Sequence, residues 1–437
     1  MKQRSWRFDI FLFFLLFFAS LIIFRDSLST FFVQDDFILI NQFSQNSLLQ
    51  DIKNVFGLPQ VTHWRPIHNL FFLIAGNIFD KNYVGYHLLT FLFQIGSGFL
   101  IYKVVRMLTK DHKSGLIAGL IYTIHPAHFI SLFWISGSAT VIGFFFLVTS
   151  FYCYFVDRKI ASLILYVISL LASEAMVVGL AIFTSYEFLF KKEKTDKFLL
   201  TITGIMSVIF LIIRFVFFTP KVTIDVYQLE LSAKVLNAIK YYLLRTAGFA
   251  EASGDKIVSL ILFGWLTLII LLLFKSLNKK QNINLLIFSI VTIIAGFSPF
   301  ILIPSHLSPH YMNVSIFGFA IIIGLALKQL RPVTSFVFLL IFLGISIYNI
   351  NLTKSNNWVF KRADLAKAYV EQIEKENSLP ESKLVFADNK MSTSQEAYIA
   401  LGTGEAIKFW FKDKNYRMCF TFFENCDFSQ NKIFILD

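Results

Sequence analysis

The sequence predicts an all-α protein that crosses a membrane about eleven times and ends in a small α/β domain. Hydrophobic residues make up 56% of its 437 residues, Phe alone occupies 53 positions, and the mean hydropathy is +0.64. Soluble domains are about 45–50% apolar even when Gly is counted. The composition therefore excludes an ordinary soluble domain and favours a polytopic membrane protein.

The first apolar run, residues 8–24, follows Lys2, Arg4 and Arg7 and begins like a signal peptide. No small-residue cleavage site follows it, because residues 25–26 are Arg and Asp. We therefore expect an uncleaved first span, since roughly 20 apolar residues cross the hydrocarbon core. Further spans are predicted near residues 84–105, 115–133, 138–156, 160–173, 175–190, 198–218, 257–274, 283–303, 311–327 and 332–349.

Basic residues gather in the loops on one side of this predicted topology. The positive-inside rule makes that side cytoplasmic, which places the N-terminus inside and, after an odd number of spans, the C-terminus outside. The net charge of +12 is then mainly topological, with anionic lipids as a second partner and no role for nucleic acid. The basic residues are Lys2, Arg4, Arg7, Lys103, Arg106, Lys110, Lys113, Arg158, Lys159, Lys191, Lys192, Lys194, Lys197, Lys275, Lys279, Lys280, Lys328 and Arg331.

A sharp change in composition predicts two domains. Residues 1–350 form the membrane domain, whose first outer loop is 25–83, and residues 351–437 form a small extracytoplasmic α/β domain. Cys419 and Cys426 lie in the second domain and are close enough in sequence to form a disulfide in an oxidising compartment. The elements expected there are helices at 361–377 and 394–411 and strands at 383–388, 417–423 and 432–436.

Two adjacent acids, Asp35 and Asp36, follow the first span. A pair of this kind is often a solvated loop or a helix cap. Here apolar residues flank it on both sides, at 31–33 and 37–40, and hold it at the interface. A carboxylate in such a place has a raised pKa and can act as a general base. Two acids do not make a metal site, since hard cations need more oxygen ligands, so no metal is predicted.

A second group, His63, Arg65 and Pro66, closes the first outer loop. Pro66 disfavours helix at Arg65 and can begin a helix at its own position. An Arg and a His beside a free helix N-terminus form a good anion site. The alternative reading is an interfacial Trp-Arg belt that anchors a surface or re-entrant helix at 67–79, and the two readings are compatible.

Three further positions are candidates for substrate binding. His125 and His128 lie near the outer end of a span, where one of them is expected to contact a donor phosphate or sugar, although structural histidines are common there. Glu174 lies between two apolar runs and is either functional or paired with Arg or Lys. His310 and Tyr311 lie at the outer edge of a later span.

Taken in order, these motifs resemble the GT-C superfamily of polyprenyl-phosphate-sugar glycosyltransferases. The likeness is greatest to the membrane part of the transmembrane tetratricopeptide-type O-mannosyltransferases. It covers residues 8–190 and, less fully, 295–330. Ile130, Ser138, Ser173 and His310 replace the Glu, Arg, Lys and Arg of the family pattern. The matching stretches are Asp35-Asp36, Arg65-Pro66-Ile67, Tyr86-His87, His125 to Ser138, Ser173-Glu174 and His310-Tyr311.

The resemblance implies a lipid-linked sugar donor and an acceptor hydroxyl on a glycan, lipid or protein. Asp36 or Asp35 would deprotonate that hydroxyl for a single inverting displacement outside the cytoplasm. Arg65, with His125, His128 or His310, would stabilise the leaving lipid phosphate. The family chemistry needs no cofactor, and a divalent metal is not predicted.

Two alternatives come from other functional classes. A transporter or lipid flippase commonly has paired halves with broken helices and charges at the bilayer midplane, and neither is evident here. The lost basic positions also allow a diverged, inactive member that acts as a scaffold. The bias toward Phe, Ile, Asn and Lys suggests an AT-rich bacterial genome and hence the plasma membrane.

Overall fold

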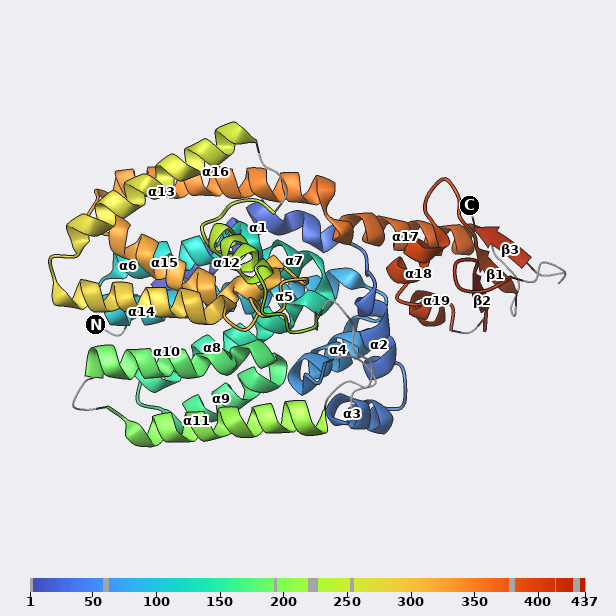
Figure 1. Ribbon diagram of the computed structural model, residues 1–437, viewed down its shortest axis with the longest axis horizontal. Coiled ribbons are helices and arrows are strands. Elements are labelled where there is room, and N and C mark those ends of the chain that lie inside the picture. Colours follow the sequence, from blue (N-terminus) through green and yellow to red (C-terminus); the bar gives the residue numbers. More distant parts are fainter. Residues whose placement is uncertain are drawn as a thin grey trace.

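The short helices of the first outer loop and the C-terminal α/β unit lie at the same end of a helical bundle. The computed structural model describes residues 3–57, 63–191, 195–218, 227–251, 255–376, 382–412, 414–426 and 433–436. The long helices lie along one direction, with the N-terminus at the opposite end from the α/β unit (Figure 1). Helices α2 (Asp35–Ser44), α3 (Leu48–Phe56) and α4 (Pro66–Phe79) cover the end of the bundle nearest that unit.

Eight helices among the described residues are long and apolar enough to span a membrane, and a pair bent by 43° makes nine if it counts as one span. The bent pair is α6 (His112–Thr123) with η2 (Pro126–His128) and α7 (Phe129–Phe133). The eight are α1 (Gln3–Phe24) with η1 (Arg25–Ser29), α5 (Tyr83–Thr109), η3 (Ile135–Ser138) with α8 (Ala139–Phe155), α11 (Lys197–Ile212) with η7 (Ile213–Phe217), α13 (Lys256–Ser276), α14 (Lys280–Phe297), η9 (Pro309–Met312) with α15 (Asn313–Leu327), and α16 (Pro332–Asn356).

The predicted count of about eleven spans is not confirmed. Helix α9 (Lys159–Ala172) has 14 residues and α10 (Gly179–Tyr186) has 8, whereas a straight span needs roughly 20. Short η4 (Glu174–Val178) and η5 (Glu187–Lys191) flank α10. The run 115–133 also bends rather than forming a straight span, because Pro126 cannot continue the hydrogen-bond ladder of α6. The protein is nevertheless a multi-pass membrane protein.

Helix starts follow familiar local chemistry. Pro66 is the first residue of α4, where its missing N–H is not needed. Side chains of Asn82, Asp111 and Asp255 accept hydrogen bonds from the free N–H groups of α5, α6 and α13. Small residues then allow close packing: a Cβ added to Gly119 would lie 2.8 Å from a carbonyl oxygen of α5.

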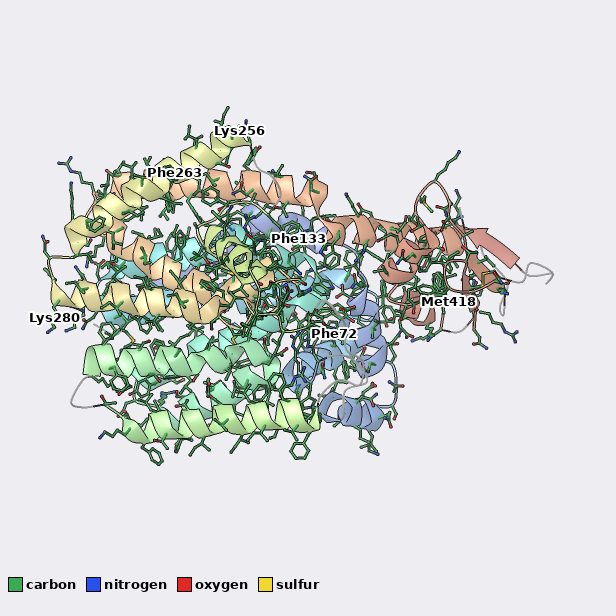
Figure 2. The ribbon with its side chains drawn as sticks, in the orientation of Figure 1. Phe72, Phe133, Lys256, Phe263, Lys280 and Met418 are labelled. Carbon is green, nitrogen blue, oxygen red and sulfur yellow. A yellow bond between two sulfur atoms is a disulfide. The ribbon has the colours of Figure 1, made fainter. Side chains whose placement is uncertain are left out.

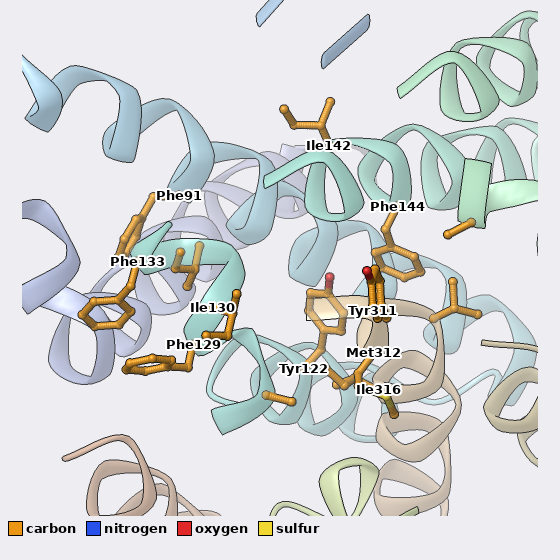
Figure 3. Packing of buried hydrophobic residues seen from close by; sticks show 14 of the residues in the cluster. Phe91, Tyr122, Phe129, Ile130, Phe133, Ile142, Phe144, Tyr311, Met312 and Ile316 are labelled. Atoms are coloured by element: carbon orange, nitrogen blue, oxygen red, sulfur yellow. The ribbon is translucent and has the colours of Figure 1, made fainter. Parts of the chain in front are cut away.

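The core lies between α5, α6, α8 and α15. Tyr122 stacks on Phe144 with ring centroids 5.3 Å apart and donates a hydrogen bond of 3.0 Å to Asn313. Figure 3 shows both rings packed beside Met312. By contrast, Phe263 on the peripheral α13 is 63% exposed (Figure 2), as a lipid-facing side chain requires.

The C-terminal unit contains α17 (Trp358–Glu376), α18 (Ser394–Ala400) and α19 (Glu405–Trp410) around a three-stranded parallel sheet. The sheet order is β2 (Arg417–Phe420), β1 (Lys383–Phe386), β3 (Ile433–Leu436). The single helix predicted at 394–411 is two helices, because Gly402 and Gly404 adopt positive φ values of 57° and 93°. Cys419 and Cys426 form a disulfide.

Candidate active site

A cavity of about 420 Å³ lies at the end of the bundle where the first outer loop meets the later spans. Its wall comes from five separate stretches of chain, so only the tertiary fold assembles it. Five of the predicted site residues line it: Asp35, His63, Arg65, His310 and Tyr311. The remaining lining residues are Gln34, Ile38, Leu39, His68, Asn69, Trp134, Ser136, Gly137, Ala139, Thr140, Tyr227 and His306.

The two adjacent acids have different surroundings. Asp36 is 1% exposed and does not line the cavity. Its carboxylate accepts hydrogen bonds from the Val33 N–H at 3.0 Å, the Ser136 N–H at 2.7 Å and the Ser136 hydroxyl at 2.6 Å. Burial raises the pKa of Asp36 to about 7 although these donors act in the opposite direction. Asp36 therefore ties α2 to η3 and is engaged by protein donors away from the cavity lining.

Asp35 is half-buried and faces the cavity as the first residue of α2. Burial raises the pKa of its carboxyl group, while a hydrogen bond from Gln34 and the charges of Arg362 and Arg65 oppose the shift. Successive residues of an α-helix project about 100° apart, which is why one acid faces the cavity and the next is buried. Of the predicted pair, Asp35 is the one placed to act as a base.

Arg65 faces the cavity from the turn before α4 and is held by Glu174. The two side chains form a bidentate pair, with Nε and Nη2 of Arg65 each 2.8 Å from a carboxylate oxygen. Nη1 makes no hydrogen bond to a described residue. His63 Nδ1 lies 3.4 Å from the same carboxylate. Burial alone would raise the pKa of Glu174, but Arg65 and His63 hold it well below its usual range.

Glu174 itself does not line the cavity, and the structure places it as a partner of Arg65; its contact with a substrate stays a prediction. The pairing with an Arg was the alternative reading of this acid. The two residues are 109 positions apart, and nothing in either motif indicates that they meet.

The opposite wall carries histidine and tyrosine rings. Tyr227 packs on His306 with ring centroids 4.4 Å apart, and His310 packs on Tyr311 at 3.9 Å. The Ser308 hydroxyl lies 2.6 Å from His310 Nδ1, which fixes the ring. Burial lowers the pKa of His306 and raises that of Tyr227, so both rings favour the neutral form.

Sequence reasoning did not select Tyr227 or His306 as site residues. His306 lies within the stretch from Pro304 to Tyr311 that drew attention to His310, and this closeness in sequence was the available signal. Tyr227 lies in a loop without a recognisable motif, and no sequence signal pointed to it.

Neither His125 nor His128 lines the cavity, and contact of either with the donor stays a prediction. Both are buried, at 0% and 1% exposure. Nε2 of His125 lies 3.1 Å from the Thr246 carbonyl oxygen, and Nε2 of His128 lies 2.8 Å from that of Tyr122. His128 is thus placed to satisfy a backbone carbonyl near the end of α6, and His125 one at the end of the later helix that ends at Thr246.

In the part of the chain that the structure describes, no group of three or more His, Cys, Asp or Glu side chains has the arrangement of a metal site. The absence of a metal requirement stays a prediction. Chemically, the cavity combines one carboxylate with a raised pKa, one fixed guanidinium and several neutral imidazole and phenol groups. This set can accept a proton at one wall and hydrogen-bond an anion at another.

No protein-family model matches the sequence, and no curated protein matches it. Solved structures do match. Arabinofuranosyltransferase AftD from Mycobacteria aligns with a TM-score of 0.50 at 10% identity, over 88% of this chain and 30% of that one. At this identity the likeness shows a similar fold alone.

Two structures of the Archaeoglobus fulgidus oligosaccharyltransferase also align, each with a TM-score of 0.48. The apo form is 12% identical over 96% of this chain and 65% of that one. AglB in complex with an inhibitory peptide and a dolichol-phosphate is 13% identical over 94% and 64%. This chain thus spans under a third of AftD and just under two thirds of the oligosaccharyltransferase. The finer resemblance to O-mannosyltransferases gains no support from these structures.

Proposed function

We propose that this protein is a membrane glycosyltransferase that moves a sugar from a polyprenyl-phosphate donor to an acceptor hydroxyl on the extracytoplasmic face. The supporting observation is the placement of Asp35, the one Asp or Glu among the described residues that line the cavity, with Arg65 and four histidines in the lining of the same cavity. The GT-C fold is compatible with this activity and does not by itself select the donor.

In the proposed reaction the acceptor O–H bond breaks and its proton goes to the Asp35 carboxylate. The acceptor oxygen forms a bond to the anomeric carbon as the bond from that carbon to the phosphate oxygen breaks, which inverts the configuration. The electron pair leaves with the lipid phosphate. The free Nη1 of Arg65 hydrogen-bonds that phosphate as its charge develops, a contribution of about 3–4 kcal/mol by analogy with oxyanion-hole donors.

In this proposal Glu174 holds the Arg65 guanidinium in the orientation that the reaction needs. The bidentate pair occupies Nε and Nη2, so the guanidinium cannot rotate and Nη1 is fixed. Neutral His63, His306 and His310 can donate further hydrogen bonds without adding permanent charge. A transporter would place its charged groups nearer the bilayer midplane, whereas α2, which begins at Asp35, and α4, which follows Arg65, lie at the end of the bundle (Figure 1).

The test is transfer from radiolabelled polyprenyl-phosphate sugars by purified protein, with membrane extract as the acceptor source. We expect Asp35→Asn and Arg65→Ala to lose activity by at least about 100-fold while remaining folded. Asp26→Asn is the matched control, since Asp26 lies outside the cavity and pairs with Lys354 at 2.8 Å. Addition of EDTA is expected to leave transfer unchanged. An inactive wild type, or full activity in Asp35→Asn, contradicts the proposal.

A further inference from the structure

The C-terminal unit is packed against the loop that carries Asp35. Asn41 on α2 donates hydrogen bonds of 2.8 and 2.9 Å to the backbone and side chain of Glu405 on α19. Lys81 donates to the carbonyl oxygen of Trp410 at 2.8 Å, and the Trp410 ring lies 5.1 Å from that of Phe31. Figure 1 shows the unit beside α2 at the end of the bundle.

Within this contact, polar groups form a chain that ends at Asp35. Arg362 on α17 forms a bidentate pair with Glu396, at 3.0 and 3.1 Å, through Nε and Nη2. Its third nitrogen, Nη1, donates a hydrogen bond of 3.0 Å to Oε1 of Gln34. Gln34 directly precedes Asp35 in the chain, and its side chain acts to lower the pKa of the Asp35 carboxyl group. The groups therefore run from the Glu396 carboxylate through the Arg362 guanidinium and the Gln34 amide to the neighbouring Asp35 carboxylate.

The backbone at Gln34 is held by the same unit. Gln34 adopts a positive φ of 53°, which is unfavourable for a residue with a Cβ. Its N–H donates to the Ala400 carbonyl oxygen at 3.0 Å. A Cβ added to Gly402 would lie 2.4 Å from the Gln34 carbonyl oxygen, so the C-terminal backbone touches this residue directly. Such strain persists only where the surroundings determine the conformation.

We propose that Arg362 is a positioning residue for the reaction, and that the C-terminal unit completes the active site by holding Gln34 and, through it, Asp35. This inference rests on the proposed function for its catalytic consequence. Its structural part, that Arg362 orders residues 31–44, is independent of the proposed function.

The charged groups around Asp35 define the expected pH effect. Arg362 and Arg65 favour its ionised form, whereas the neighbouring carboxylate of Asp36 disfavours it. The ionisable rings that line the same cavity are those of His63, His68, His306, His310, Tyr227 and Tyr311. Asp35 must be ionised to accept a proton, so removal of the Arg362 charge moves the acidic limb of the pH–rate profile to higher pH.

The experiment compares Arg362→Met, Arg362→Lys and Gln34→Glu with Lys361→Met, an exposed neighbour on α17. We expect kcat to fall about tenfold or more in Arg362→Met, with the donor KM changed less than about threefold. Arg362→Lys keeps the positive charge but loses the bidentate geometry of the guanidinium, so we expect its pH–rate profile to be closer to that of wild type than its kcat. Gln34→Glu removes the donor to Asp35 and adds a like charge, so its acidic limb also moves to higher pH. Lys361→Met is expected to match wild type.

Hydrogen–deuterium exchange of peptides within 31–44 is the second measurement, and it needs no substrate. Faster exchange in Arg362→Met than in Lys361→Met supports the inference. If wild type transfers sugar but Arg362→Met and Gln34→Glu keep its pH profile and its exchange, the inference is wrong and the proposed function stands. If wild type transfers nothing, the proposed function fails and the exchange data still decide whether Arg362 orders this loop.

Discussion

Asp35→Asn and Asp36→Asn make the same change at adjacent positions but are expected to affect different properties. Asp36→Asn should lower the stability of the protein, whereas Asp35→Asn should abolish sugar transfer and leave stability intact. At position 36 an Asn can keep Oδ1 for the two donors of Ser136, but its amide nitrogen then faces the Val33 N–H. The Val33 N–H and the Asn side-chain N–H are then two buried donors without an acceptor. Each costs about 1–3 kcal/mol, so the free energy of unfolding falls by about 2–6 kcal/mol.

At position 35 the change removes a charge that burial disfavours, and an Asn oxygen can still accept the hydrogen bond from Gln34. Stability is therefore expected to stay level or rise slightly, while sugar transfer is lost. Thermal unfolding in detergent, followed by Trp fluorescence and size exclusion, measures the first quantity and the transfer assay measures the second. A stable, inactive Asp36→Asn beside an unstable, active Asp35→Asn would refute the assignment of these two acids.

Three further predictions follow from the site and its surroundings. Glu174→Gln removes the charge that orients Arg65, so we expect a loss of about 1–3 kcal/mol in the free energy of unfolding and roughly tenfold weaker donor binding. Thermal unfolding and donor titration measure these two quantities, and unchanged donor binding would contradict the role of the pair. Arg245 lies on α12 (Lys234–Thr246) and is 9% exposed, and its Nε and Nη1 have no hydrogen-bond partner among the described residues. Arg245→Met is therefore expected to leave the free energy of unfolding unchanged or to raise it in the same assay. Marked destabilisation would contradict this expectation. Finally, transfer should rise with pH through the pKa of Asp35, which burial places above the ordinary 3.8, and a pH–rate profile that is flat on its acidic side would exclude an ionised Asp35 as base.

Much of the membrane architecture was predictable because it depends on local composition. Apolar runs of 18 residues or more, at 83–109 and 256–276 for example, are helices of the expected length. The short runs after residue 159 were harder, since hydropathy measures apolar length and does not reveal where a helix ends. The run 115–133 was predicted as one span, whereas the helices bend by 43° at Pro126, an angle that depends on how the neighbouring helices pack.

The candidate site was predictable in part. Asp35, His63, Arg65, His310 and Tyr311 were selected from motifs at predicted outer edges, and all five line one cavity. The same reasoning selected His125 and His128, whose ring nitrogens lie within hydrogen-bond distance of backbone carbonyls, because a motif does not show which way a side chain points.

The sequence by itself determined that this is a multi-pass membrane protein with acids and bases collected at one end of its helices, because hydrophobic run length and charge placement are local properties. The tertiary structure decided which of two adjacent acids faces the cavity, that Glu174 holds Arg65, and that Arg362 reaches Gln34 across 328 residues. These contacts join segments with no sequence periodicity in common. Their geometry depends on helix rotation and on the close packing of the whole bundle, which no single segment encodes.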